Sequence, residues 1–219
     1  GLQGFNVTAP HKLTAASLCD ELSETALLTG AANTVRLRAG RWQGHNTEVG
    51  GLREVMAASV GAHTQARGMV FGAGGVARAA VAALLDLVNG GVRVMARAGQ
   101  GRDGLAAWLA EDSFASCDVR CVPWGSVPAD LWDGPGLVCV ACVPRGVDCS
   151  FLTDAPAAPA ILWWLDMNYG ERTAVPPGVA QQAYRDGLAV LLAQGALSFT
   201  WWFDRDAPRR AMADAVAAR

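Results

Sequence analysis

The sequence predicts an α/β fold built on a parallel sheet, and three observations support this. Between Met69 and Val94 a short apolar strand, a glycine-rich turn, a long alanine-rich helix and a second strand follow one another as one βαβ unit. Apolar segments of strand length recur as far as Asp166, and after Pro177 the pattern predicts helices only. Strands that alternate with helices indicate a parallel sheet covered on both faces.

The N-terminal 47 residues have a different pattern and predict part of a second lobe. A strand-like segment begins almost at once after Gly1, so we expect that a preceding piece of structure has been cut away. Helices are expected around residues 12–29, and a hairpin is expected from Thr34 to Trp42 with its turn at Ala39-Gly40. We expect the helices at the end of the chain to return and pack on this lobe.

The other elements follow from apolar runs and from the residues that end them. The helix of the βαβ unit should stop at Asn89-Gly90-Gly91, because glycine favours the position just after a helix. Strands are expected at 68–71, 92–95, 118–122, 137–143 and 161–166, and helices at 76–88, 105–110, 179–184, 187–202 and 208–218.

Composition and charge exclude several classes of protein. A chain of 219 residues has room for one large or two small domains, and 52% hydrophobic residues exclude a disordered chain. The net charge of −2, with basic residues scattered singly, provides no basic stripe for nucleic acid. The apolar runs fall short of the roughly 20 residues that cross a bilayer, and we recognise no signal peptide. We expect a monomer or homodimer that binds a small molecule.

The cysteines allow two interpretations. Cys139 and Cys142 have the spacing of a metal or redox pair, and Cys117 and Cys121 lie upstream as two further thiolates for a zinc site. Cys139 and Cys142 also lie in an apolar run that predicts a buried strand, where a free cysteine behaves as a small hydrophobe. We favour free thiols without a metal, which are typical of a cytoplasmic protein.

The turn at residues 72–77 matches the pattern G-x-G-x-x-A between a strand and a helix. Gly72 would make the tight turn, Gly74 would let the backbone approach a pyrophosphate, and Ala77 would let the helix lie close to the sheet. The helix N-terminus offers free N–H groups to phosphates. Simple packing is the alternative, but the context favours a dinucleotide site in a Rossmann-type domain.

The end of the second strand indicates which dinucleotide is bound. Enzymes that use NAD place an acidic residue there to hold the ribose 2′-hydroxyl, but residues 95–98 read MARA. Arg97 and Arg102 are suited to a 2′-phosphate. They are alternatively two solvated surface arginines. The position of Arg97 favours NADP.

Lys12 and Glu48 are candidates for moving a hydroxyl proton. Lys12 follows a strand and a proline turn, and Glu48 begins a helix. Both residues also fit ordinary helix-terminal positions, and their spacing alone does not decide between the two interpretations.

Six blocks together resemble the shikimate dehydrogenase family. The block GFNVTAPHK (4–12) resembles N-V-T-x-P-x-K, and GAANTV (30–35) resembles G-A-x-N-T. The block GHNTEVG (44–50) resembles G-x-N-T-D-x-x-G, and GAGGVARA (72–79) resembles G-A-G-G-x-x-R-A. Finally, DMNY at 166–169 resembles D-x-x-Y, and GLAVLLAQ (187–194) resembles G-L-x-M-L-x-x-Q.

The resemblance implies two α/β lobes with a cleft between them. The NADP-binding domain (48–186) would be inserted into the smaller substrate-binding domain (1–47 and 187–219). It implies catalysis by Lys12 and Glu48, and substrate binding by Thr8, Asn33, Glu48, Tyr169 and Gln194. The cofactor would be held by Gly72, Ala73, Gly74, Gly75, Val76, Arg97, Arg102, Met167 and Gly187.

The sequence departs from the family pattern in three places. Glu48 stands where the family has Asp, and a displacement near 1 Å can cost on the order of a hundredfold in rate. The turn at 140–145 reads VACVPR instead of N-A-T, and 96–98 keeps only the arginine of Asn-Arg-Thr. In the family, a Ser-x-Ser motif for the substrate carboxylate lies in the piece that we expect before Gly1, and residues 1–219 contain no such motif in a matching context.

The implied activity is reduction of 3-dehydroshikimate to shikimate with NADPH, in the biosynthesis of aromatic amino acids. Quinate or aminoshikimate dehydrogenases would share nearly every block. A binding protein without catalytic activity is the other alternative, and the retained Lys12 and Asn33 argue against it.

Overall fold

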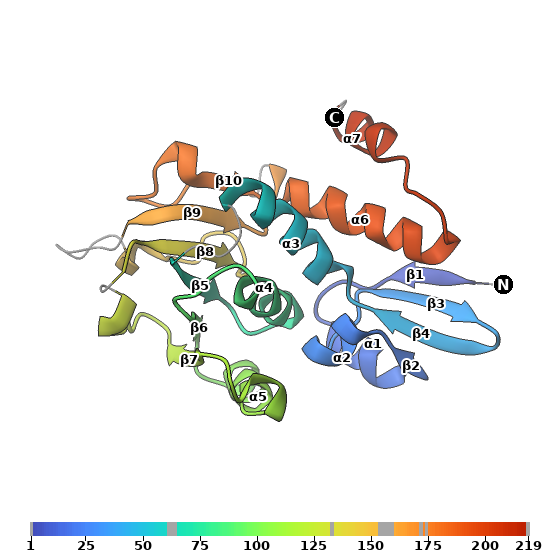
Figure 1. Ribbon diagram of the computed structural model, residues 1–219, viewed down its shortest axis with the longest axis horizontal. Helices are drawn as coiled ribbons and strands as arrows, with labels where there is room; N and C mark the ends of the chain where they lie inside the picture. Colours follow the sequence, from blue (N-terminus) through green and yellow to red (C-terminus); the bar gives the residue numbers. More distant parts are fainter. Residues whose placement is uncertain are drawn as a thin grey trace.

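The computed structural model describes residues 2–60, 65–131, 134–152, 160–170, 173 and 175–217 (Figure 1). Two sheets are separate in sequence and in space, with the four-stranded sheet formed by the N-terminal strands and the six-stranded sheet by the later ones.

The N-terminal lobe contains the smaller sheet, with the strand order β1-β3-β4-β2. Its elements are β1 (Gly4–Asn6), α1 (Lys12–Leu18), β2 (Glu21–Leu22), α2 (Glu24–Thr29), β3 (Thr34–Arg38) and β4 (Arg41–His45). The predicted hairpin is confirmed, because β3 and β4 pair antiparallel. Ala39 and Gly40 both have positive φ, 50° and 77°, as a tight hairpin turn requires. The short strand β2 between the two helices was not predicted.

The larger sheet is parallel throughout, with the order β10-β9-β8-β5-β6-β7. The strands are β5 (Arg67–Phe71), β6 (Val92–Ala96), β7 (Val119–Pro123), β8 (Leu137–Ala141), β9 (Ile161–Asp166) and β10 (Tyr184–Asp186). The helices are α3 (Thr47–Val60), α4 (Gly75–Leu85), α5 (Gln100–Leu109), α6 (Leu188–Phe203) and α7 (Arg209–Ala217). From β5 the chain runs outward in one direction through β6 and β7, and then returns to β8 on the other side. The strand order thus reverses between β5 and β8, where such sheets bind ligands.

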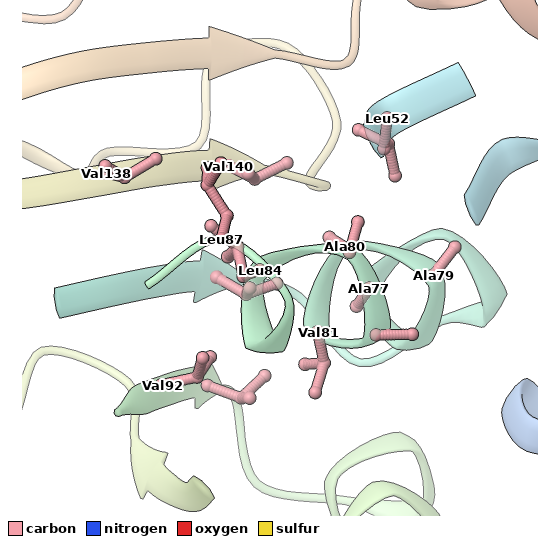
Figure 2. Close-up of a cluster of buried hydrophobic side chains, with 14 of the residues drawn as sticks. Leu52, Ala77, Ala79, Ala80, Val81, Leu84, Leu87, Val92, Val138 and Val140 are labelled. Atoms are coloured by element: carbon pink, nitrogen blue, oxygen red, sulfur yellow. The ribbon is translucent and has the colours of Figure 1, made fainter. Parts of the chain in front are cut away.

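The two faces of the parallel sheet are covered differently. Figure 2 shows the face under α4, where alanine, valine and leucine side chains of the helix meet the valines of β6 and β8, with Leu52 of α3 beside them. The opposite face packs Phe71, Met95 and Trp164 against 3₁₀ turns and loops, of which Leu131 and Leu152 are buried members. Both faces are covered, as predicted.

One predicted element is wrong. Residues 179–184 were expected to form a helix, and only helices were expected after Pro177. In the structure a 3₁₀ turn (Gln181–Ala183) leads into β10 (Tyr184–Asp186), which pairs with Trp164–Asp166 of β9. Pairing along an existing sheet edge outweighs the weak local preference of so short a segment.

Two long helices connect the lobes. Helix α3 leaves the small sheet toward the large one, α6 returns, and the two pack side by side (Figure 1). The lobes also meet directly, since Trp108 Nε1 of α5 donates a hydrogen bond of 2.8 Å to Leu28 O of α2. The predicted division into 1–47 with 187–219 and 48–186 stays a prediction. Among the described residues, no helix is both long and apolar enough to cross a membrane.

Candidate active site

The site begins with a buried ion pair at the junction of the lobes. Lys12 Nζ, on the first residue of α1, donates a hydrogen bond to Glu48 Oε1 near the start of α3, and their side chains are only 9% and 5% exposed. The other carboxylate oxygen, Glu48 Oε2, is buried and has no hydrogen-bond partner among the described atoms. Lys12 is also the only lysine among the 18 lysines and arginines of the chain.

Local structure fixes the position of Glu48. Asn46 Oδ1 accepts a hydrogen bond of 3.1 Å from Glu48 N, which is the side-chain cap expected at a helix start. The Asn46 amide nitrogen in turn donates to Thr29 Oγ1 at 2.9 Å and to Ala31 O at 3.1 Å. A carboxylate in the first turn of a helix is also stabilised by the free backbone N–H groups there.

A cavity of about 500 Å³ opens beside this pair. Both lobes contribute to its wall, which is formed by residues of β1, α1, α3 and α6, by the start of α4 and by the turn after β9. The cavity brings together nine residues predicted from the sequence: Thr8, Lys12, Asn33, Glu48, Val76, Met167, Tyr169, Gly187 and Gln194. These positions span most of the chain, so the predicted substrate residues and two of the predicted nicotinamide contacts line one space.

Asn33 and Gln194 are joined across the cavity wall. Asn33 Nδ2 donates to Gln194 Oε1 at 3.1 Å, and Asn33 Oδ1 accepts from Thr47 N at 2.9 Å. The loop that carries Asn33 is held to the lysine helix, because Ala32 N donates to Lys12 O at 2.9 Å. This backbone hydrogen bond therefore fixes the position of Asn33 relative to Lys12.

The glycine-rich turn has the geometry of a cofactor cradle. Gly72 has φ of +120°, and a Cβ there would lie 2.7 Å from Cys142 O, so this close turn requires glycine. Gly74 is the N-cap of α4 and has no side chain to cap the helix, and a Cβ at this position would meet nothing within 4 Å. The first N–H groups of α4 are thus open to an anion, which is the environment a pyrophosphate needs. These residues fit a dinucleotide.

The predicted phosphate-binding arginines lie outside this cavity, around the same turn. Arg97 follows β6 directly and is exposed, and Arg102 is half-buried in the first turn of α5. Helix α5 adjoins the glycine turn, since a Cβ at Gly101 would lie 3.6 Å from Ala73 Cβ. Ala96 and Ala98 on either side of Arg97 bear no negative charge.

The glycine turn also touches the catalytic candidates. A Cβ at Gly75 would lie 3.3 Å from Lys12 Cβ and 3.5 Å from Ala31 Cβ. On the other side of the cavity, Gly187 packs on the backbone of Met167, where a Cβ would be only 2.5 Å from Met167 O. The glycine-rich turn and the predicted substrate residues therefore share a boundary.

The cysteines form no disulfide. All six are free, and burial raises the pKa of the Cys139 and Cys142 thiols well above the ordinary value. Cys139 is fully enclosed in the apolar packing of the sheet. Within the described ranges, no group of three or more His, Cys, Asp or Glu side chains is arranged to hold a metal ion.

Sequence reasoning missed seven residues of the cavity wall: Asn6, Val7, Ala9, Asn168, Leu191, Gly195 and Ser198. Asn6 and Asn168 lie inside recognised motifs, so their positions in those motifs were a signal that could have identified them. Ser198 lies one helical turn after Gln194, and this spacing was the only local indication.

Two family models match the two ends of this chain, and curated relatives match along its length. Residues 1–35 match the family model of the shikimate dehydrogenase substrate binding domain, and residues 187–217 match that of the shikimate 5′-dehydrogenase C-terminal domain. The shikimate dehydrogenase (NADP(+)) of Anaeromyxobacter sp. (strain K) is 35% identical over 228 residues, covering 100% of this chain and 78% of the relative.

Solved structures with the same architecture include two dehydrogenases. A shikimate dehydrogenase in complex with NADP+ superposes with a TM-score of 0.79 at 25% identity, covering 100% of this chain and 77% of that one. A quinate dehydrogenase from Corynebacterium glutamicum in complex with NAD has a TM-score of 0.77 at 23% identity, covering 100% and 79%, and shows the fold alone. The two-lobed fold, the six motifs and the match to a curated relative along the whole chain lead to one conclusion: this chain belongs to the shikimate dehydrogenase family.

Proposed function

We propose that this protein is an NADP-dependent oxidoreductase that interconverts 3-dehydroshikimate and shikimate, in the biosynthesis of aromatic amino acids. The observation that carries the proposal is the buried Lys12–Glu48 pair, because both residues line a cavity walled by both lobes. The nicotinamide would supply or accept the hydride at this cavity.

The protein's own residues would bind the ring and transfer one proton. In reduction, Lys12 Nζ would donate a hydrogen bond to the carbonyl oxygen and pass it a proton as the oxygen becomes a hydroxyl. Glu48 Oε1 orients the ammonium group, and Glu48 Oε2 would accept a hydrogen bond from a neighbouring ring hydroxyl. Thr8, Asn33, Tyr169 and Gln194 would hold the other oxygens of the ring.

The identity of the basic residue supports catalysis over simple binding. An arginine remains charged at any working pH, whereas a lysine can release and regain a proton. This chain uses arginine at every basic position except Lys12. A protein that only bound an anionic ring would have no need for a titratable group there.

The preference for NADP rests on the residues after β6. Arg97 and Arg102 would pair with the 2′-phosphate, which an acidic residue at the strand end would repel. Gly72 to Val76 would cradle the pyrophosphate, with Met167 and Gly187 against the nicotinamide. We assign residues 48–186 to the cofactor domain and residues 1–47 and 187–219 to the substrate domain. The six free thiols favour a cytoplasmic location.

The test measures turnover of shikimate and quinate with NADP and with NAD. We expect shikimate with NADP to be the fastest combination. Lys12→Ala should lower kcat by about 10²- to 10⁴-fold and leave NADPH binding near the wild-type value. Because Lys12 is the only lysine, an amine-selective reagent can modify one side chain, and bound shikimate should protect it in a mass-spectrometric assay. Turnover by Lys12→Ala within twofold of wild type would contradict the assignment.

A further inference from the structure

A buried polar cluster lies under the proposed substrate cavity. Ser198 Oγ of α6 lies 2.8 Å from Thr34 Oγ1 of β3 and 3.2 Å from Thr47 Oγ1 of α3. Asn6 Nδ2 of β1 donates to Ser198 Oγ at 3.2 Å and to Thr34 Oγ1 at 3.1 Å. Thr34, Thr47 and Ser198 are each at most 1% exposed, whereas Asn6 is exposed, so the cluster joins four elements and its three hydroxyl residues are buried.

One backbone donor fixes the orientation of Asn33. The peptide N–H of Thr47 can only donate, and it points to Asn33 Oδ1 at 2.9 Å. Thr47 Oγ1 donates to the same oxygen at 3.1 Å. The oxygen of this amide therefore faces the cluster, and its nitrogen faces Gln194 Oε1.

The orientation of Gln194 follows from that of Asn33. Gln194 uses its oxygen to accept from Asn33 Nδ2, which leaves its own amide nitrogen for a ligand. The second N–H of Asn33 is also left over. This wall of the cavity thus offers amide donors, beside the Lys12–Glu48 pair that lines the same cavity.

Ser198 completes a directed chain of hydrogen bonds. Its single proton goes to Gln194 O, one turn earlier on α6, at 3.0 Å. Ser198 Oγ must therefore accept in its remaining bonds. It accepts from Asn6 Nδ2, and it takes the Thr34 proton because its 2.8 Å contact with Thr34 Oγ1 is shorter than the 3.1 Å contact of that hydroxyl with Asn33 Oδ1. The two lone pairs of Asn33 Oδ1 then remain for Thr47 N and Thr47 Oγ1. Without Ser198, the Thr34 hydroxyl would turn to Asn33 Oδ1, which lies 3.1 Å away, and compete with Thr47 for it.

We propose that Ser198 is a positioning residue for substrate. The hydrogen bonds of Ser198 connect α6 to β3 and α3. They keep Gln194 opposite Asn33, so that both amides present N–H groups to oxygen atoms of the ligand. The identity of that ligand as shikimate rests on the proposed function, whereas the arrangement of the amides does not.

The experiment compares Ser198→Ala with a matched control, Ser59→Ala. Ser59 makes the same type of bond to the carbonyl four residues earlier, at 2.8 Å, but is exposed on α3 and far from the cluster in the fold. Loss of one buried hydrogen bond should raise KM for shikimate about 2- to 12-fold in Ser198→Ala. We expect kcat within twofold of wild type and unchanged NADPH affinity, with all three constants unchanged in Ser59→Ala.

A second measurement does not need turnover. In ¹⁵N-labelled protein, the side-chain amide signals of Asn33 and Gln194 should shift in Ser198→Ala and in Thr34→Val, and stay in place in Ser59→Ala. Absence of shikimate turnover by the wild-type protein would contradict the proposed function and leave this test intact. An active Ser198→Ala with KM within 1.5-fold of wild type, or with both amide signals unmoved, would overturn the role of Ser198.

Discussion

Glu48→Asp tests whether the longer side chain is part of the working geometry. The family pattern has Asp here, yet the Glu48 carboxylate already reaches Lys12 Nζ and forms a buried hydrogen bond. Removing one methylene withdraws the carboxylate by about 1.3 Å if the backbone stays in place. Because Asn46 caps α3 at this point and is bonded to α2 in turn, the backbone has little freedom to follow.

The magnitude follows from that displacement. A reacting group displaced by about 1 Å costs on the order of a hundredfold in rate, or about 2.7 kcal/mol of transition-state stabilisation. We therefore expect kcat for shikimate oxidation to fall about 30- to 100-fold in Glu48→Asp. NADPH binding should change little, because Glu48 lies at the substrate side of the cavity.

The assay follows formation of reduced nicotinamide from shikimate and NADP at saturating cofactor. Glu24→Asp is the matched control, because Glu24 also begins a helix but is exposed on α2. It should leave kcat within twofold of wild type. An unchanged or higher kcat in Glu48→Asp would refute the reasoning, and would mean that a site designed for Asp is only tolerating Glu.

Four other predictions test the cofactor site, the fold and the thiols. Arg97→Ala should weaken NADPH binding by about 1 to 3 kcal/mol in calorimetric titration and leave NADH binding unchanged. Gly72→Ala, which forces a Cβ against Cys142 O, should lower the free energy of unfolding by about 1 to 3 kcal/mol, whereas Gly104→Ala within α5, where a Cβ meets nothing within 4 Å, should not lower it. Burial lowers the pKa of His45 from 6.5 to about 4. Between pH 6.5 and pH 4 the unfolded chain therefore binds a proton that the folded chain does not. The free energy of unfolding should therefore fall by about 2 to 3 kcal/mol as pH drops from 6.5 to 4, and less in His45→Gln. Metal analysis of the purified protein should find no zinc, and one tightly held equivalent would contradict our interpretation of Cys139 and Cys142.

The parallel sheet was predictable because its signals are local. A short apolar strand, a glycine turn and an alanine-rich helix can each be recognised from about a dozen residues. Accordingly, β5, α4 and β6 form where the pattern predicts them. Strand β10 carries no such signal. Its three residues form a strand only because Trp164–Asp166 of β9 present an open edge to them, which is a tertiary property.

In the candidate site, too, the residues with a local sequence signal were predictable and those that depend on tertiary contacts were not. Lys12, Asn33, Glu48 and Gln194 lie in motifs that a reader can recognise, and the structure brings them to one cavity. Ser198 has no motif, because its partners are 192, 164 and 151 residues away in sequence. The importance of such a hydroxyl depends on three tertiary contacts, so composition and spacing alone did not identify it.

The contact between Gly75 and Lys12 links the two halves of the proposed chemistry. Gly75 is the first residue of the helix that would hold the cofactor pyrophosphate, and Lys12 begins the helix that would deliver the proton. A Cβ at Gly75 would lie only 3.3 Å from Lys12 Cβ, a close contact that a small shift of Lys12 would have to relieve. The glycine would therefore serve both the approach of a phosphate and the position of the proposed catalytic lysine. A change in the glycine-rich turn should consequently alter kcat as well as cofactor affinity, because this turn and Lys12 are in contact.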